Sequence, residues 1–389
     1  MAGLRRVSAL MNSPVARGFV LQALLGIAML ALAYMLVHNL AGNLQRANIR
    51  SGFAFLEGRA GFEIARPLIQ YTIDSTYGRA LAVGFLNTLM VAVAGIVSAT
   101  IIGFCVGIGR LSQNWLLARL CALYVEFFRN LPPLLVVFFW YLGILSVLPH
   151  PRESLRLPLD IYLNNRGLTV PIPEFGNGMG LVAGMAIASI ASSILLMRWA
   201  RIRQARTGKR FPIVLACAGL ISGSTIAAFL AAGAPLTFSY PVAGTFNLAG
   251  GSTIGPEFIS LYLALSFYTA SFIAEIVRAG IQGVPKGQTE AARALGLRSR
   301  AITSLIVVPQ AFRIIIPPLT SQYLNLTKNS SLAIAVGFSD LIAVGGTTLN
   351  QTGQAIEVIA IWMTIYLGLS VTTSVFMNWF NARMALVER

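Results

Sequence analysis

The chain has 389 residues, of which 56% are hydrophobic and only 11% charged, and its mean hydropathy is +0.73. A soluble protein of this length would carry roughly twice that charged fraction. The composition therefore excludes an ordinary soluble globular protein and indicates a membrane protein that crosses the bilayer several times.

Eight apolar runs are long enough to cross a bilayer, which takes about 20 helical residues each. They lie near 19–40, 82–109, 120–147, 181–200, 212–232, 258–280, 314–340 and 355–380. The first run is longer than the core of a signal peptide, and no small-residue cleavage site follows it closely. We therefore predict that residues 1–81 form an uncleaved anchor helix followed by a periplasmic segment.

The 29 basic and 13 acidic residues give a net charge of +16, so the distribution of charge matters. With a cytoplasmic N-terminus, 19 basic residues fall in cytoplasmic segments and 8 in outside segments, as the positive-inside rule requires. The basic run 198–210 is therefore interpreted as a topology anchor and not as a nucleic-acid patch. We expect both termini to be cytoplasmic and no nucleic acid to be a partner.

The second and third runs contain signals for close packing and for a break. Small residues recur at every fourth position of the second run, which lets helices approach closely; they are Gly95, Ala99, Gly103 and Gly107. In the third run Glu126 and Arg129 can pair one turn apart. Pro132 and Pro133 then break the backbone hydrogen bonds and should kink the span.

Residues 149–257 comprise an outside loop, a helical hairpin at 181–232 and a second outside loop. The hairpin contains no acidic residue, and its polar side chains are mainly Ser and Thr, which can bond back to their own helix. We predict that it is a peripheral accessory hairpin that faces lipid or another subunit. The three cysteines and two histidines suit neither a disulfide framework nor a metal site.

A cytoplasmic stretch at 290–309, EAARALGLRSRAITSLIVVP, lies between two apolar runs. A carboxylate is stabilised in the first turn of a helix by the positive end of the helix dipole, so the sequence predicts a short helix that starts at Glu290. Gly296 is placed to end that helix as a left-handed cap. Pro309 marks the restart of structure towards the membrane. The small-residue face of this helix could lie close against another protein.

The residues of this stretch have the spacing of the EAA loop of ATP-binding-cassette (ABC) importer permeases, with Val308 where Leu is usual. The matching residues, which the resemblance assigns to ATPase coupling, are Glu290, Ala291, Ala292, Gly296, Ile306 and Pro309. The run from Glu275 to Ala311 and the segment after Lys328 resemble the polar amino acid branch. With its long insertion, the chain is most similar to the general L-amino acid and the glutamate/glutamine/aspartate/asparagine permease subunits.

The resemblance implies an all-α fold of about eight spans: a type I (MetI-like) transmembrane domain at 82–380, with an inserted helical hairpin. Its core would be 82–148 and 258–380, the insertion 149–257, and the cytoplasmic coupling loop 281–313. It also implies a bacterial inner-membrane location and transport of polar L-amino acids. The expected partners are an ATPase, a second and different permease, a periplasmic amino-acid-binding protein and membrane lipid.

No Gly-x-x-x-x-Gly-Lys-Ser/Thr sequence is present, so the chain has no P-loop for nucleotide phosphates. We therefore expect no cofactor and no catalytic site in this chain, with ATP used by the partner ATPase. An ion-coupled secondary transporter is the alternative, because eight spans with intramembrane charges would also suit one. No convincing inverted repeat supports it, and it would not explain the loop at 290–309.

The candidate substrate pathway lies in the seventh run. Gln322, Asn325 and Asn329 follow i, i+3, i+7 and form one polar stripe, flanked by Ser321 and Lys328. Such a stripe is poorly tolerated against lipid, so it should face a cavity or another helix. A hydrogen-bonded seam between helices is the alternative. The other intramembrane candidates for the pathway are Glu275, which can pair with Arg278, and Arg129.

Overall fold

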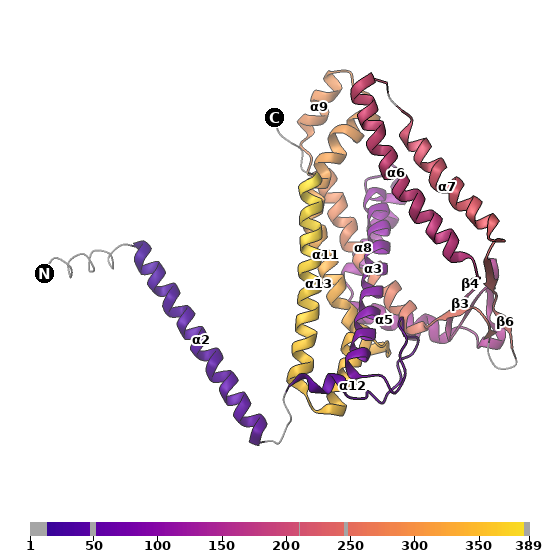
Figure 1. The fold of residues 1–389 in the computed structure, drawn as a ribbon. Coiled ribbons are helices and arrows are strands. Elements are labelled where there is room, and N and C mark those ends of the chain that lie inside the picture. Colours follow the sequence, from indigo (N-terminus) through magenta and orange to yellow (C-terminus); the bar gives the residue numbers. More distant parts are fainter. Residues whose placement is uncertain (1–13, 47–51, 210, 245–247, 385–389) are drawn as a thin grey trace. The chain divides into compact units, whose positions relative to one another are not determined.

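The computed structural model describes residues 14–46, 52–209, 211–244 and 248–384, which are predominantly helical (Figure 1). They fall into two compact units. One consists of Met1–Val125 with Thr269–Arg389, and the other of Glu126–Tyr268. The predicted insertion, 149–257, lies within the second unit.

The first unit contains most of the long helices, and α4 and α8 run from it into the second. They are α2 (Pro14–Arg46), α3 (Tyr77–Gly109), α4 (Trp115–Arg129), α8 (Pro256–Gln282), α9 (Lys286–Ala294), α10 (Ser299–Ile302), α11 (Val308–Asn329), α12 (Leu341–Thr352) and α13 (Ala355–Met384). Short 3-10 helices occupy Phe53–Glu57 and Ser330–Val336, and a π-helical turn occupies Thr303–Val307.

All eight predicted spans are helical. Seven described helical segments are long and apolar enough to cross a membrane, and α4 with the helical residues Pro133–Val147 makes an eighth if that bent pair is one span. The seventh span differs in its bounds, because helical structure runs through Ser299–Val336 and not through 314–340.

The third span is broken more sharply than a kink. α4 ends at Arg129, α5 (Pro133–Phe138) begins at the second proline, and the two helical segments meet at 108°. Proline lacks the N–H that would continue a helix but suits the first position of a new one. A π-helical turn, Phe139–Ile144, and a 3-10 turn, Leu145–Val147, follow α5.

The two predicted outside loops are not irregular, because their short strands pair with each other. The strands are β1 (Leu155–Leu157), β2 (Ile161–Asn164), β3 (Gly167–Val170), β4 (Ile172–Phe175), β5 (Leu236–Ser239), β6 (Val242–Ala243), β7 (Leu248–Ala249) and β8 (Ser252–Ile254). One antiparallel sheet has the order β1-β2-β3-β8, and β4–β5 and β6–β7 form two further pairs. The prediction of an all-helical chain therefore missed these strands, which are too short for an alternating pattern to show.

The predicted hairpin follows β4 and precedes β5 in sequence. It is formed by α6 (Met179–Thr207) and α7 (Ile213–Ala231), which pack side by side (Figure 1). Pairing of β3 with β8 and of β4 with β5 joins the chain before the hairpin to the chain after it. The two helices are therefore held together at one end by sheet pairing and at the other by a short loop.

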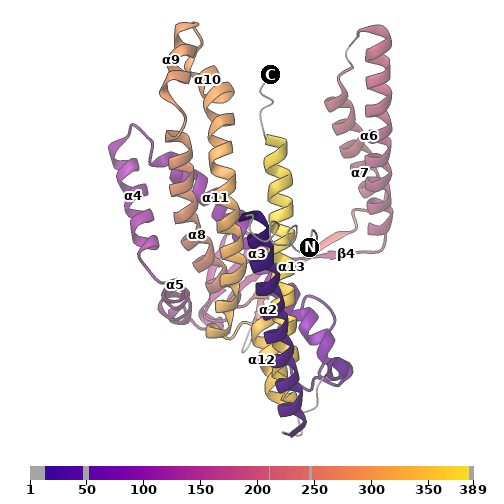
Figure 2. The same cartoon turned by 90° about the vertical axis from the view of Figure 1, so that its left-hand side faces the viewer.

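The small residues predicted to allow close approach in α3 are buried. A Cβ atom on Gly103 would lie 2.6 Å from the Cβ of Ile273, and one on Gly107 would lie 2.7 Å from the carbonyl oxygen of Ala274. Both contacts are with α8, so glycine is what lets these two helices touch. At the other end of α11 from α9, α12 packs against α3 (Figure 2).

Candidate functional site

The predicted cytoplasmic helix is α9, but it starts earlier than expected. Its first residue is Lys286, after Pro285, and its first turn contains no acidic residue. The extended backbone of Pro285 (ψ 130°) separates α9 from α8, so helical structure resumes at once behind it. Glu290 lies in the second turn, and the dipole argument that placed the start there was wrong.

The end of α9 follows the prediction. Gly296 has a φ of +72°, the left-handed conformation that glycine adopts most easily. Its N–H donates to the carbonyl oxygen of Arg293 at 2.9 Å, and the N–H of Leu297 donates to that of Ala292 at 3.2 Å. These two bonds together are a Schellman cap, which satisfies carbonyl groups at the helix end.

The two faces of α9 differ in character. Ala292 is only 3% exposed, on the side where α9 packs against α10 and the turn Thr303–Val307. At about 100° per residue, the opposite face consists of Gly287, Glu290 and Ala294, with Ala291 at its edge. All four residues are exposed. Leu295, beside the cap, is 81% exposed. The helix thus presents an exposed surface of mainly small side chains away from its own chain.

The helix that follows does not restart at Pro309 as predicted. It begins at Ser299, continues through the π-helical turn Thr303–Val307 and runs on into α11. A wider turn of this kind accommodates a proline, whose missing N–H would otherwise interrupt the helix. Ile306 and Pro309, the last two members of the predicted coupling motif, are both half-buried here.

The base of α9 is a close contact between α8 and α11. A Cβ atom on Gly280 of α8 would lie 2.3 Å from Cγ1 of Ile315 and 3.3 Å from the carbonyl oxygen of Ala311. α8 and α11, which precede and follow the segment of α9 and α10, therefore touch below that segment (Figure 2). We call this contact, with the end of α3 that joins it, the base.

Charged side chains fasten α3 to α8 in the base. Arg110, directly after α3, forms an ion pair with Glu275, and Arg278 pairs with the same carboxylate one turn along α8. The predicted Glu275–Arg278 pair is thus present. The third member, Arg110, was missed because 165 residues separate it from Glu275 in sequence. Elsewhere the hydroxyl groups of Thr100 and Tyr323 lie 2.8 Å apart and connect α3 to α11.

The predicted pathway residues are distributed over several places. Four share α11, with Asn325 and Lys328 exposed and Gln322 and Asn329 half-buried. Glu275 contacts Arg110 and Arg278 in the base. The remaining candidate, Arg129, is the last residue of α4 and belongs to the other compact unit.

A buried polar group that the sequence interpretation missed lies at the start of α12. Asp340 is fully buried, and its Oδ1 accepts a hydrogen bond of 2.8 Å from the N–H of Ala343, which makes it the N-cap of α12. Its Oδ2 has no partner among the residues that the structure describes. Burial raises the pKa of this carboxyl from 3.8 to about 7. An aspartate directly before an apolar helix is a capping signal that could have identified it.

The fold and the site define a class of protein: a helical, multi-pass membrane component that presents a short accessory helix where two of its spans meet. Residues 99–386 match the family described as "Binding-protein-dependent transport system inner membrane component". The chain belongs to this family and is a multi-pass permease component of an ABC transporter in the inner membrane. Family membership implies an ATPase and a partner permease, and it decides against the ion-coupled carrier.

Relatives with assigned names agree with this family. The chain is 64% identical to the general L-amino acid transport system permease protein AapQ of Rhizobium johnstonii, over 97% of this chain and 95% of that protein. It is 40% identical to the glutamate/glutamine/aspartate/asparagine transport system permease protein BztB of Rhodobacter capsulatus, over 99% of this chain and 97% of that one. A solved amino acid ABC transporter crystallised with histidines covers 79% of this chain and 95% of its own, with 18% identity and a TM-score of 0.47.

Proposed function

We propose that the chain is a permease subunit of an importer of polar L-amino acids, driven by an ATPase that docks on α9. The substrate class rests on the two relatives, which are named for general L-amino acid transport and for transport of glutamate, glutamine, aspartate and asparagine. The neutral amide of Gln322 on α11 agrees with acidic or amide substrates, because an amide donates and accepts hydrogen bonds without attracting a cation.

The observation that carries the proposal is the orientation of α9. Ala292 fixes the helix to its own chain, and the cap at Gly296 ends it, so the face with Glu290 and Ala291 is turned outward. Small side chains let a second protein approach the helix backbone closely. Movement of a docked ATPase would then reach α8 and α11 through the base. ATP hydrolysis belongs to that separate subunit, since this chain has no P-loop sequence.

The polar stripe on α11 is assigned to the substrate pathway. Asn325 and Lys328 are exposed on this chain, and a polar surface that faced lipid would be costly. The pathway would run between this permease and a second, different permease. A periplasmic binding protein would deliver the substrate, and membrane lipid would surround both permeases. Both termini are cytoplasmic in this arrangement, as the distribution of basic residues favours.

The test replaces Ala291 with arginine, which puts a long charged side chain on the outward face of α9. The tagged chain is expressed with its ATPase and partner permease, and the amount of co-purified ATPase and the uptake of labelled glutamate are measured. We expect both to fall about fivefold or more, since overpacking costs about 1–3 kcal/mol and 1.4 kcal/mol is tenfold in affinity.

The matched control is Gln288→Arg, which adds the same side chain at an exposed position one turn before Ala292, away from the outward face of the same helix. It should retain most of the ATPase and of the uptake. Normal amounts of both with Ala291→Arg would contradict the docking assignment. Loss of uptake for every amino acid with the ATPase still bound would show that the helix couples without being the main contact.

A further inference from the structure

The loop end of the α6–α7 hairpin holds a concentration of positive charge, and the hairpin itself contains no acidic residue to neutralise it. The last turns of α6 and the loop carry Arg198, Arg201, Arg203, Arg206 and Lys209. No aspartate or glutamate occurs between residues 175 and 256. A negatively charged partner for these residues must therefore come from outside the hairpin. A role as topology anchor requires only positive charge at this end and no particular arrangement of the side chains.

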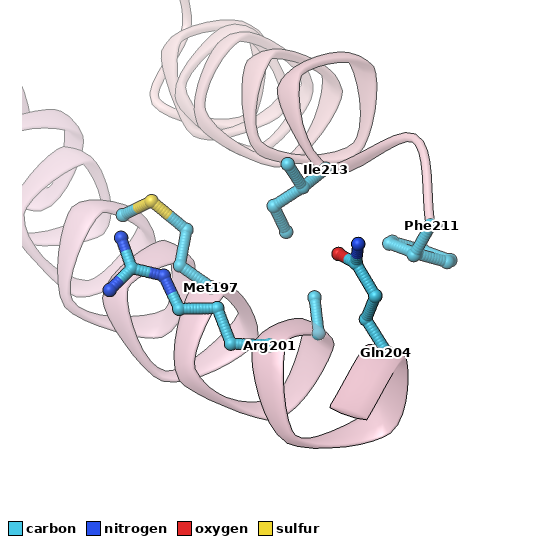
Figure 3. Close-up of a pocket in the computed structure, with 6 residues that line it drawn as sticks. Met197, Arg201, Gln204, Phe211 and Ile213 are labelled. Carbon is cyan, nitrogen blue, oxygen red and sulfur yellow. The ribbon is translucent and has the colours of Figure 1, made fainter. Parts of the chain in front are cut away.

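A cavity of about 120 Å³ lies within this charged end (Figure 3). Its apolar wall is formed by Met197 and Ala200 of α6 and Ile213, the first residue of α7. Arg201 and Gln204 supply its polar side, and Phe211 of the loop lines it as well. The lining of the cavity thus combines one cation and one amide with apolar side chains, which is the composition expected for a ligand with an anionic head and a hydrocarbon tail.

The length of α7 places this cavity at the membrane surface. At 1.5 Å per residue, the 19 residues of Ile213–Ala231 span about 28 Å, close to the ~30 Å hydrocarbon thickness of a bilayer. Ile213 therefore lies at the boundary between acyl chains and headgroups. Arg201 and Gln204 face the headgroup side of that boundary, because α6 continues beyond it to Thr207.

The loop wall of the cavity is held in place by stacking. The rings of Trp199 and Phe211 meet edge to face with centroids 5.6 Å apart. The guanidinium of Arg203 lies 5.3 Å from the Trp199 ring centre and 5.7 Å from that of Phe211. Cation–π contacts of this kind fix Arg203 against the aromatic pair. Arg203 thus has a structural role, because it packs against the aromatic pair. Arg201 is the cation that lines the cavity.

We propose that this cavity binds the phosphate headgroup of an anionic phospholipid. The Arg201 guanidinium pairs with the phosphodiester, the Gln204 amide donates to a phosphate or glycerol oxygen, and an acyl chain follows the surface of Met197 and Ile213. Basic pockets between transmembrane helices are suited to such headgroups. The hairpin would then anchor the permease in anionic regions of the membrane, a role separate from coupling and transport.

The experiment measures lipid bound by the purified full-length chain. The chain is incubated with vesicles made of phosphatidylglycerol and phosphatidylcholine in equal parts, and the lipids that remain bound are identified by native mass spectrometry. Arg201→Gln should reduce bound phosphatidylglycerol about fivefold, as expected for one basic contact with anionic lipid. The control is Arg206→Gln, five residues on and about 140° around α6, outside the cavity; it should reduce binding less than twofold.

Three results would overturn the proposal. Equal losses for the Arg201 and Arg206 variants would show a diffuse electrostatic effect and no site. Equal binding of the two lipids by the unaltered chain would show no selection for the anionic headgroup. Displacement of phosphatidylglycerol by excess inorganic phosphate would assign the cavity to a free anion. Thermal midpoints of both variants check folding, and a folding loss with Arg201→Gln is resolved by Arg201→Lys, which should retain more than half of the binding.

Discussion

The tight contact between α3 and α8 gives a sharp prediction for Gly107→Ala. The added Cβ would lie 2.7 Å from the carbonyl oxygen of Ala274 and 2.8 Å from the Cβ of Val277. Relaxed contacts between carbon atoms are about 3.5–4.0 Å, so the helices would have to separate by up to about 1 Å. Overpacking of this kind typically costs about 1–3 kcal/mol of folding free energy, and a backbone carbonyl cannot rotate aside as a flexible side chain can.

Alanine also favours helix by up to about 1 kcal/mol over glycine, which would mask part of this cost. The matched control is Gly368→Ala in α13, where a Cβ would meet no atom of the described chain within 4 Å. Both variants gain the same helix propensity, so the difference between them isolates the overpacking. We expect the Gly107 variant to have a thermal midpoint about 2–10 °C below that of the control, measured on purified protein in one detergent.

Uptake should fall with Gly107→Ala as well, because the altered spacing lies in the base that carries α9. Normal uptake with a lowered thermal midpoint would show that the contact between α3 and α8 contributes to folding stability and not to transport. Equal midpoints for the two variants would refute the reasoning, because they would show that α3 and α8 are not in close contact in the membrane.

Two other predictions concern single polar side chains. Gln322→Glu should reduce uptake of glutamate and aspartate more than uptake of basic amino acids, because it adds a negative charge to the stripe; unchanged rate and preference, measured by competition, would place Gln322 in a helix seam instead. For Asp340, the raised pKa means that the folded state holds a proton between about pH 4 and 7 that the unfolded state has lost, so stability should fall as pH rises through this window. Asp340→Asn keeps an N-cap oxygen and removes this titration, so its thermal midpoint should fall less between pH 5 and pH 8 than that of the unaltered chain.

Local signals made most of the fold predictable from sequence. Apolar runs of about 20 residues identified every span because bilayer thickness fixes their length. Gly296 identified the end of α9, since this cap requires a residue in the left-handed backbone conformation, which glycine adopts most easily. Pro132 and Pro133 located the break in the third span, although the angle of 108° could not be inferred from them.

Features that depend on distant residues were not predictable. Arg110 has no local reason to pair with Glu275, and the sheets of the second unit join segments that flank a helical hairpin of more than 50 residues. The start of α9 was misplaced because Glu290 gave a plausible dipole signal, whereas the proline at 285 decided the boundary. Local chemistry thus defined the elements, and pairing across the chain defined the base and the sheets.

The position of prolines in α11 connects the base to the polar stripe. Ile315 contacts Gly280 in the base, and Gln322 lies two turns further along the same helix. Pro317 and Pro318 lie between them, and neither can donate a backbone hydrogen bond to the preceding turn. The missing hydrogen bonds make this the turn of α11 that resists bending least, so a displacement of α9 that reached Ile315 would next meet this turn. Motion of a docked ATPase would therefore change the angle between the base and the stripe more readily than it would shift the whole helix along its axis.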